Sequence, residues 1–139
     1  MLPYEVALSQ RHAAVRWWAT SGLMLWLGDR TRQLDGAHVE YLRGIENVVG
    51  VKCGPGMTAG ELERLIDRLD PHGRAGKLVL IGRFGARKVG DMLVPLMHAT
   101  KGRPVIWTID PMHGNTSIAA NRKVSRLPDI LAKNDAFFA

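Results

Sequence analysis

The stretch VVGVKCGPGMTAGELERLIDRL, residues 48–69, decides the fold. It opens with an almost continuous apolar run, crosses a loop rich in glycine and proline, and ends in an amphipathic pattern. That pattern places four apolar residues at i, i+3, i+4 and i+7: Leu62, Leu65, Ile66 and Leu69. Thr58 and Glu61 have the spacing of a capping box, which predicts where the helix begins. Because a short apolar run without alternation is typical of a strand buried on both faces, the stretch predicts one strand–helix unit of a parallel sheet.

The same unit repeats along the chain. Short apolar runs bounded by glycine, proline or charged residues predict further strands at 23–27, 78–81 and 105–109. Helical patterns predict helices at 5–18, 89–96 and 130–138, with a short helix at most over 38–44. The expected order is one helix followed by four strand–helix units, spaced as βα units are.

Repeats of this kind build either a doubly wound sheet or a (β/α) barrel. A complete barrel takes about 250 residues, and this chain has 139. We therefore expect a single α/β domain over residues 1–139, a half TIM-type (β/α) barrel with about four parallel strands. Its outer strands would have open edges and its inward face would be apolar, and both features favour pairing. The simplest expectation is a homodimer of two half-barrels that meet edge to edge or face to face.

Composition limits the class of protein and its partners. Hydrophobic residues make up 46% and charged residues 23%, as in ordinary globular proteins. No apolar run approaches the roughly 18 residues of a membrane span, no signal-peptide pattern opens the sequence, and Cys53 is the single cysteine. We therefore expect a cytoplasmic protein that does not associate with a membrane. The net charge of +6 predicts an anionic partner, either nucleic acid or a phosphorylated small molecule.

The residues that follow the predicted strands carry the chemistry, because sites of α/β folds gather beyond the carboxyl ends of strands. Lys52 and Arg83 each end an apolar strand, where an unpaired charge is costly. An arginine fork suits a carboxylate or phosphate, and lysine offers a compact positive charge. Gly54 and Gly56 would let a ligand approach the backbone ahead of a helix N-terminus. Together these features favour a site for a small phosphorylated or carboxylated ligand.

Other charged and aromatic residues have a plainer interpretation. Four cations are interpreted singly as solvated loop charges: Arg30, Arg32, Arg87 and Lys88. Trp107 is interpreted as a core residue, and nucleic-acid binding is disfavoured because no basic stripe with interleaved aromatics is present. Cys53 is interpreted as a small buried residue rather than a nucleophile of lowered pKa.

His113 leaves three roles open: a metal ligand, a general acid or base, or a loop histidine. Asp110 precedes it by three residues in a turn that contains proline and glycine. With Asp110 so close, we weigh a functional role of His113 equally with that of a loop histidine.

Three strings resemble signatures of the class II 3-deoxy-D-arabino-heptulosonate 7-phosphate (DAHP) synthases. They are LWLGDRTRQLDGAH at 25–38, VGVK with GP and MT over 49–58, and DPMHGNT at 110–116. The similarity extends from Tyr4 to Phe138. Several long motifs in the same order are far more specific than one short pattern.

The resemblance implies a (β/α)8 barrel and a transferase of the shikimate pathway, which leads to aromatic amino acids. The family condenses phosphoenolpyruvate with erythrose 4-phosphate in an aldol-like reaction at a divalent metal, manganese or cobalt. The resemblance gives a role to each matched residue. By it, Lys52 and Arg83 hold the phosphate and carboxylate of phosphoenolpyruvate. Trp26 and Asp29 border that site, and Arg30 lies near the erythrose phosphate.

The resemblance also makes His113 a metal ligand and places Asp110 beside the metal and the aldehyde. The family's other metal ligands, a cysteine, a glutamate and an aspartate, have no counterpart here. We therefore expect either a natural half-barrel or a fragment of the family. The corresponding activities are a DAHP synthase-like enzyme, with Lys52, Asp110 and His113 as catalytic residues, or a non-catalytic companion. Such a companion would bind a metabolite or pair with a full-length synthase, and secondary metabolism is one setting for it.

Overall fold

A four-stranded parallel sheet forms the centre of the molecule. The computed structural model describes residues 2–12, 16–119 and 121–138. The strands are β3 (Met24–Leu27), β4 (Val48–Cys53), β5 (Leu78–Gly82) and β6 (Val105–Ile109), in the spatial order β3-β4-β5-β6. All four predicted strands are confirmed, with small changes at their ends. Neighbours along the chain are neighbours in the sheet, whereas a doubly wound sheet reverses its order, so the arrangement is consistent with part of a (β/α) barrel.

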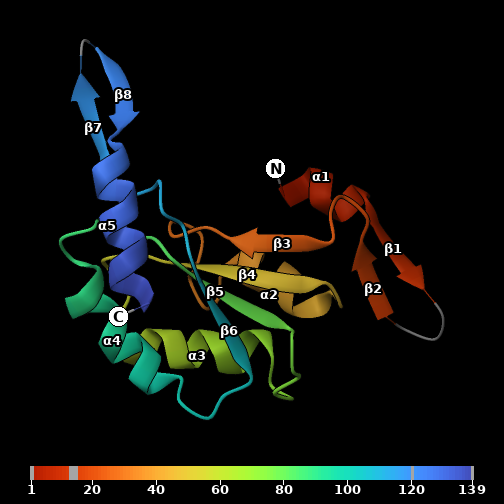
Figure 1. Cartoon of the computed structure of the whole chain (residues 1–139). Helices are drawn as coiled ribbons and strands as arrows, with labels where there is room; N and C mark the ends of the chain where they lie inside the picture. The colour runs from red at the N-terminus through yellow and green to blue at the C-terminus, as the bar shows by residue number, and fades with distance from the viewer. Residues whose placement is uncertain (1, 13–15, 120, 139) are drawn as a thin grey trace.

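Three helices cover one face of this sheet: α2 (Ala37–Gly44), α3 (Ala59–Leu69) and α4 (Val89–Ala99) (Figure 1). A fourth, α5 (Leu127–Phe138), stands at the end of the sheet next to α4. The predicted start of α3 is confirmed, because the Thr58 hydroxyl accepts the N–H of Glu61 at 3.2 Å. The carboxylate of Glu61 pairs with Arg32. The cap therefore uses the backbone N–H of Glu61, while the Glu61 side chain is taken up by its ion pair with Arg32.

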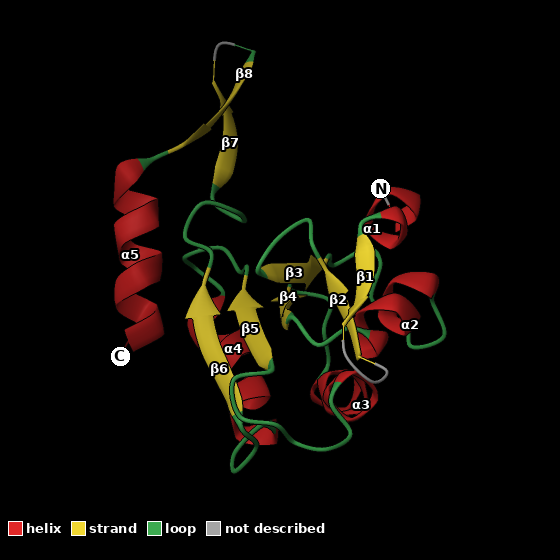
Figure 2. Cartoon of the chain, turned by 90° about the vertical axis from the view of Figure 1, so that its right-hand side faces the viewer, coloured by secondary structure: helices red, strands yellow, loops and turns green. Residues whose placement is uncertain are grey.

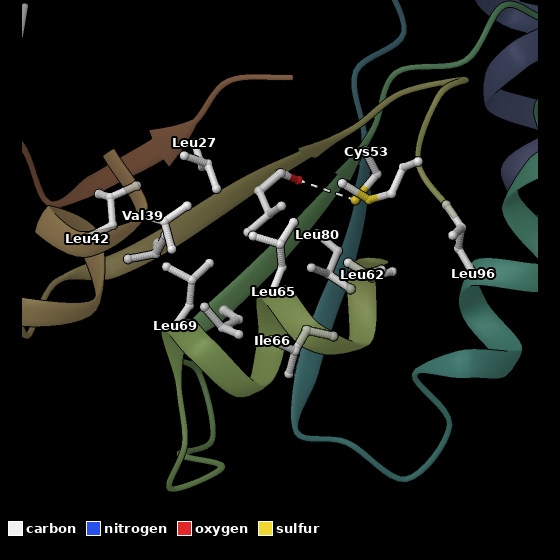
Figure 3. Close-up of a cluster of buried hydrophobic side chains, with 14 of the residues drawn as sticks. Leu27, Val39, Leu42, Cys53, Leu62, Leu65, Ile66, Leu69, Leu80 and Leu96 are labelled. Atoms are coloured by element: carbon white, nitrogen blue, oxygen red, sulfur yellow. Dashed lines mark hydrogen bonds between the residues drawn. The ribbon is translucent and has the colours of Figure 1, made fainter. Parts of the chain in front are cut away.

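The core lies between the sheet and α2, α3 and α4. Alternate rows of the sheet point toward the helices, as in the row Leu27–Val51–Leu80–Trp107. All four apolar residues of the α3 stripe are buried, and Leu62 and Leu65 are 0% exposed (Figure 3). Burying a leucine side chain contributes about 1.5–3 kcal/mol. The stripe therefore fixes α3 on the sheet and with it the loop that follows Lys52.

The opposite face of the sheet is more open. Its central row is Trp26–Gly50–Val79–Ile106, in which Trp26 is 61% and Ile106 is 52% exposed. Burial of the strands on both faces, expected from their apolar sequence, is therefore wrong for β3 and β6. A Cβ on Gly50 would come within 3.0 Å of the Ile81 Cδ1 and 3.2 Å of the Trp26 Cβ. The glycine thus leaves room for the larger side chains beside it.

The predicted helix over 5–18 is wrong. The chain forms a short helix α1 (Leu2–Ala7) and then an antiparallel hairpin of β1 (Ser9–His12) and β2 (Arg16–Ala19). The rest of the predicted helix, residues 13–15, lies outside the described residues. Asn47 holds the end of this hairpin, since its Oδ1 accepts the N–H of Ala19 at 2.8 Å and its Nδ2 donates to the Ala19 carbonyl at 3.0 Å. Tertiary hydrogen bonds therefore override the helical pattern.

A second hairpin, β7 (Thr116–Ala119) and β8 (Arg122–Ser125), stands between β6 and α5 and was not predicted. It rises away from the sheet (Figure 2). In the part of the chain that the structure describes, no helix is long and apolar enough to cross a membrane.

Candidate functional site

A cavity of about 280 Å³ opens beyond the carboxyl ends of the strands. It is lined by Trp26, Gly28, Asp29, Arg30, Thr31, Lys52, Arg83 and His113. Every predicted site residue except Asp110 lines this cavity, and Asp110 contacts two of the residues that do. The residues come from four separate strand ends, so the order of the parallel strands brings them together.

Lys52 leaves β4 on the open face of the sheet. Its Nζ lies 2.8 Å from Asp110 Oδ2 and 5.1 Å from the centroid of the Trp26 ring. The ring face stabilises the ammonium by a cation–π interaction, and the carboxylate by a charge-assisted hydrogen bond. The side chain is 19% exposed, so the charge is partly withdrawn from water but still reaches the cavity.

Asp110 is the hub of the turn after β6. Its Oδ2 faces both Lys52 Nζ and His113 Nδ1, the latter at 2.6 Å, and its Oδ1 accepts the N–H groups of Met112 and His113 at 3.2 Å each. Burial alone would raise the pKa of Asp110, but hydrogen bonds from Lys52 and His113 hold it well below its usual range. Asp110 is therefore a carboxylate that fixes a cation on one side and an imidazole on the other.

Asp29 lies between two guanidinium groups. Its Oδ1 accepts from Arg32 Nε at 3.2 Å, and its Oδ2 lies 3.4 Å from Arg83 Nη1. A Cβ on Gly54 would stand 2.9 Å from Asp29 Oδ2, so the glycine makes room for this carboxylate. We expected Gly54 to leave space for a ligand. In the structure the Asp29 carboxylate of the protein itself occupies that space.

Arg32 is not the solvated loop charge that the sequence suggested. Its side chain is only 13% exposed and pairs with both Asp29 and Glu61. The spacing of Asp29 and Arg32, three residues apart, was the signal for this pairing. Arg30, by contrast, is exposed on the rim of the cavity, as expected of a solvated cation.

The charge of the cavity suits an anion. Arg30, Lys52 and Arg83 line it against one carboxylate, that of Asp29. Arg83 is 32% exposed, and within the described residues its guanidinium makes one long contact, with Asp29, so most of its five N–H donors face other positions. A phosphate or carboxylate placed here would meet a planar fork and a compact ammonium together.

Lys133 of α5 was missed from the sequence. It is 0% exposed, and its Nζ donates to the His113 carbonyl at 2.8 Å and also to the Asp110 carbonyl. Burial lowers its pKa to about 8, with help from Arg83 and Lys52 and against the effect of Asp110. The signal was present, since Lys133 lies on the same helical stripe as Ile130 and Phe137, both partly buried.

The described residues do not form a complete metal site. His113 and Asp110 adjoin, but within residues 2–12, 16–119 and 121–138 no three His, Cys, Asp or Glu side chains gather around one point. Cys53 is buried, as predicted, and burial raises the pKa of its thiol to about 12. The thiol donates to the Val51 carbonyl at 3.5 Å (Figure 3), so it is a core group and no nucleophile.

Comparisons with known proteins agree with the resemblance carried by the strings at the strand ends. The model of the class-II DAHP synthetase family matches residues 1–139. The chain is 43% identical over 142 residues to the phospho-2-dehydro-3-deoxyheptonate aldolase of Streptomyces coelicolor, covering 99% of this chain and 32% of the relative. A probable chloroplastic aldolase of the same name from Catharanthus roseus is 43% identical, with 99% and 29% covered. The aldolase of Neurospora crassa is also 43% identical, with 96% and 32% covered. The chain thus spans about a third of the length of these curated relatives.

Proposed function

This chain belongs to the class-II DAHP synthetase family, and on that premise we propose that it supplies the phosphoenolpyruvate-binding edge of a DAHP synthase. The observation that carries the proposal is the cationic cavity beyond β3–β6, where Lys52 and Arg83 meet. The parent reaction is the condensation of phosphoenolpyruvate with erythrose 4-phosphate. The substrates and the reaction are proposed for this chain, because it spans only about a third of its relatives.

Each cavity residue has a proposed role that follows from its geometry. Arg83 offers a planar fork to a carboxylate or phosphate, and Lys52 offers a point charge that Trp26 and Asp110 hold in place. Asp29 fixes the orientation of Arg83. Arg30, free of ion pairs within the described residues, is available to a second phosphate at the rim. These groups bind and orient the two anionic substrates, which is where much of the rate of a condensation comes from.

Asp110 and His113 are the proposed acid–base pair. An ionised Asp110 accepts the Nδ1–H of His113, which leaves the imidazole Nε2 as the nitrogen that exchanges a proton in the cavity. The resemblance implies manganese or cobalt at this point. Among the described residues, His113 and Asp110 supply at most two metal ligands. We therefore propose only anion binding and proton transfer for this chain.

The sheet also carries a proposal about assembly. We propose that its four strands are a segment of a barrel and that the open row from Trp26 to Ile106 is covered by further polypeptide, either a second copy or a longer synthase chain. A homodimer predicts twice the monomer mass by light scattering at micromolar concentration. A stable monomer at that concentration would exclude the dimer.

A non-catalytic companion protein is the alternative, and it finds no support in the comparisons, which name DAHP synthetases and aldolases. A cavity that binds phosphoenolpyruvate without turnover is the result that would favour it. An assay of phosphoenolpyruvate loss in the presence of erythrose 4-phosphate and manganese separates the two.

Calorimetry with phosphoenolpyruvate tests the proposed function. We expect Lys52→Ala and Arg83→Ala each to weaken binding by about tenfold or more, since each removes a charge-assisted contact of about 1.5–3 kcal/mol. The matched control is Lys101→Ala, an exposed cation that precedes β6 at the opposite edge of the sheet, and it should bind as the wild type does. Wild-type heats equal to those of dilution, or a Lys52→Ala variant that binds unchanged, would contradict the proposal.

A further inference from the structure

The turn that carries Asp110 and His113 is attached to α5 at two points. Lys133 Nζ donates to the carbonyl oxygens of Asp110 and His113, the two ends of the turn. Asn115 Nδ2 donates to the Pro111 carbonyl at 3.1 Å and to the Asp129 carbonyl, also at 3.1 Å. The first turn of α5, through Asp129, and its middle, through Lys133, thus hold both halves of the loop after β6.

The loop is fixed from its other side by the loop that follows β5. The N–H of Ala86 donates to Asn115 Oδ1 at 2.8 Å. Gly114 has φ of 86°, and a Cβ there would lie 2.8 Å from the Gly85 nitrogen, so only glycine permits this close approach. The loop that begins with Arg83 therefore backs directly onto the turn that holds His113.

Lys133 has little freedom in this arrangement. An ammonium that is 0% exposed is tolerated only while hydrogen bonds replace its water. The acceptors are the carbonyls of Asp110 and His113, so any movement of either end of the turn removes a partner from a buried charge. The cost of that loss restricts the turn to one conformation, the one in which Asp110 faces both Lys52 and His113.

We infer that Lys133 is a positioning residue of the site: from inside α5 it holds the Asp110–His113 turn so that the carboxylate and the imidazole face Lys52 across the cavity. The inference rests on the proposed function, since it assigns Lys133 to the anion site proposed above. Lys133 itself does not line the cavity and acts through the backbone of the turn.

Lys77 provides a matched control within the same chain. It is 5% exposed, and its Nζ donates to the carbonyl oxygens of Ile45 and Asn47 at 2.6 Å each. It stands before β5, at the amino edge of the sheet, away from the cavity. Lys77 is therefore also buried and also donates to two backbone carbonyls, as Lys133 does, but it supports no proposed site residue.

The test compares Lys133→Met with Lys77→Met, two substitutions that keep the length of the side chain and remove its donors. Circular dichroism and thermal unfolding report the stability of each. Two further measurements report the site: the imidazole cross-peaks of His113 in a ¹H–¹³C spectrum, assigned with His113→Gln, and calorimetry with phosphoenolpyruvate.

We expect both variants to lose stability and only Lys133→Met to change the site. Its His113 cross-peaks should move, and its affinity for phosphoenolpyruvate should fall by about tenfold, as when a group that orients a functional side chain is removed. Lys77→Met should keep the wild-type His113 cross-peaks and bind within about twofold of the wild type. If Lys133→Met does not fold, Lys133→Gln replaces it, with the same displacement of the His113 cross-peaks expected.

Two results would overturn the inference. One is a folded Lys133 variant with wild-type His113 cross-peaks. The other is a Lys77→Met variant that shifts those cross-peaks as strongly. A wild type that binds no phosphoenolpyruvate contradicts the proposed function instead, and the His113 cross-peaks still decide the role of Lys133.

Discussion

The two edges of the sheet are built from the same kinds of residue and use them differently. At the amino edge, Lys77 donates to two carbonyls and Arg74 pairs with both Glu46 and Asp70, so each charge is met by a partner of the protein itself. At the carboxyl edge Lys52 and Arg32 are also paired, but within the described residues Arg83 makes one long ion pair and Arg30 makes none, and both line the cavity. Charges at the amino edge therefore stabilise the fold, whereas the carboxyl edge also keeps cations that can reach a ligand, as in barrel enzymes.

The largest expected effect is a loss of stability at the amino edge of the sheet. Asn47 is 5% exposed, and besides its two bonds to Ala19 its Nδ2 donates to the Gly22 carbonyl at 3.0 Å. Asn47→Ala leaves these buried backbone groups without partners and should lower the free energy of unfolding by about 3 kcal/mol. Chemical denaturation measures this loss. The exposed Asn134→Ala should change it by less than about 0.5 kcal/mol, and phosphoenolpyruvate affinity should be retained in both.

An Asn47→Ala variant that keeps its stability but binds phosphoenolpyruvate poorly would reverse the assignment of the two edges.

The next effect sharpens the carboxyl edge. Asp110→Asn removes the carboxylate that holds Lys52, at 2.8 Å. We expect phosphoenolpyruvate to bind about fivefold more weakly, since Lys52 loses the charge-assisted hydrogen bond that fixes it at the cavity. Any turnover of phosphoenolpyruvate should fall further, because His113 also loses the group that orients it. Calorimetry measures the loss of affinity, and the turnover assay measures the loss of rate. Tighter binding would show that Asp110 competes with the ligand for Lys52 instead of holding it.

A pH dependence of stability tests the structural role of the buried Lys77 at the amino edge. Burial lowers its pKa to about 8, helped by Arg74 and opposed by Glu46 and Asp70, whereas an unfolded lysine titrates near about 10.4. Between these values the unfolded chain binds more protons than the folded chain, so stability should rise with pH from about 8 to about 10. Lys133 has a similarly lowered pKa and contributes in the same window. Unfolding of the wild type and Lys77→Met across this range should therefore show a smaller rise in the variant. If the stability of both proteins changes with pH in parallel, Lys77 does not have the structural role assigned to it.

The smallest effect concerns Trp26. Its ring stabilises Lys52 at 5.1 Å, an interaction of about 0.5–1 kcal/mol at a partly exposed site. Trp26→Leu should weaken phosphoenolpyruvate binding by about two- to fivefold, because Lys52 is less firmly held. The equally exposed Ile106→Leu, in the same row of the sheet, should have no measurable effect. Equal losses in both would assign the effect to packing on the open face.

The strands and the helices that follow them were predictable because their signals are local. The stripe from Leu62 to Leu69 and the apolar run before Lys52 each specify one element, and strand order then gathers Lys52, Arg83, Asp110 and His113 at one edge. The N-terminal hairpin was not predictable, since it depends on hydrogen bonds from Asn47, some 28 residues away.

Two charged residues near the site were not predicted for a related reason. Arg32 was interpreted as a solvated loop charge and Lys133 was missed, and the burial of both depends on partners that only the folded chain supplies. Because Lys133 falls on an apolar helical stripe, the sequence already indicated that its side chain is buried.

Mapping phosphoenolpyruvate on the amide resonances of the whole chain tests the comparison of the two edges most directly. A ¹H–¹⁵N titration should shift the amides that surround the cavity, those of Gly28, Asp29, Lys52, Arg83 and His113, in a saturable way. The amides around Asn47 and Lys77 at the amino edge should not move. Saturable shifts at the amino edge, or a titration that moves no amide beyond β3–β6, would contradict the account.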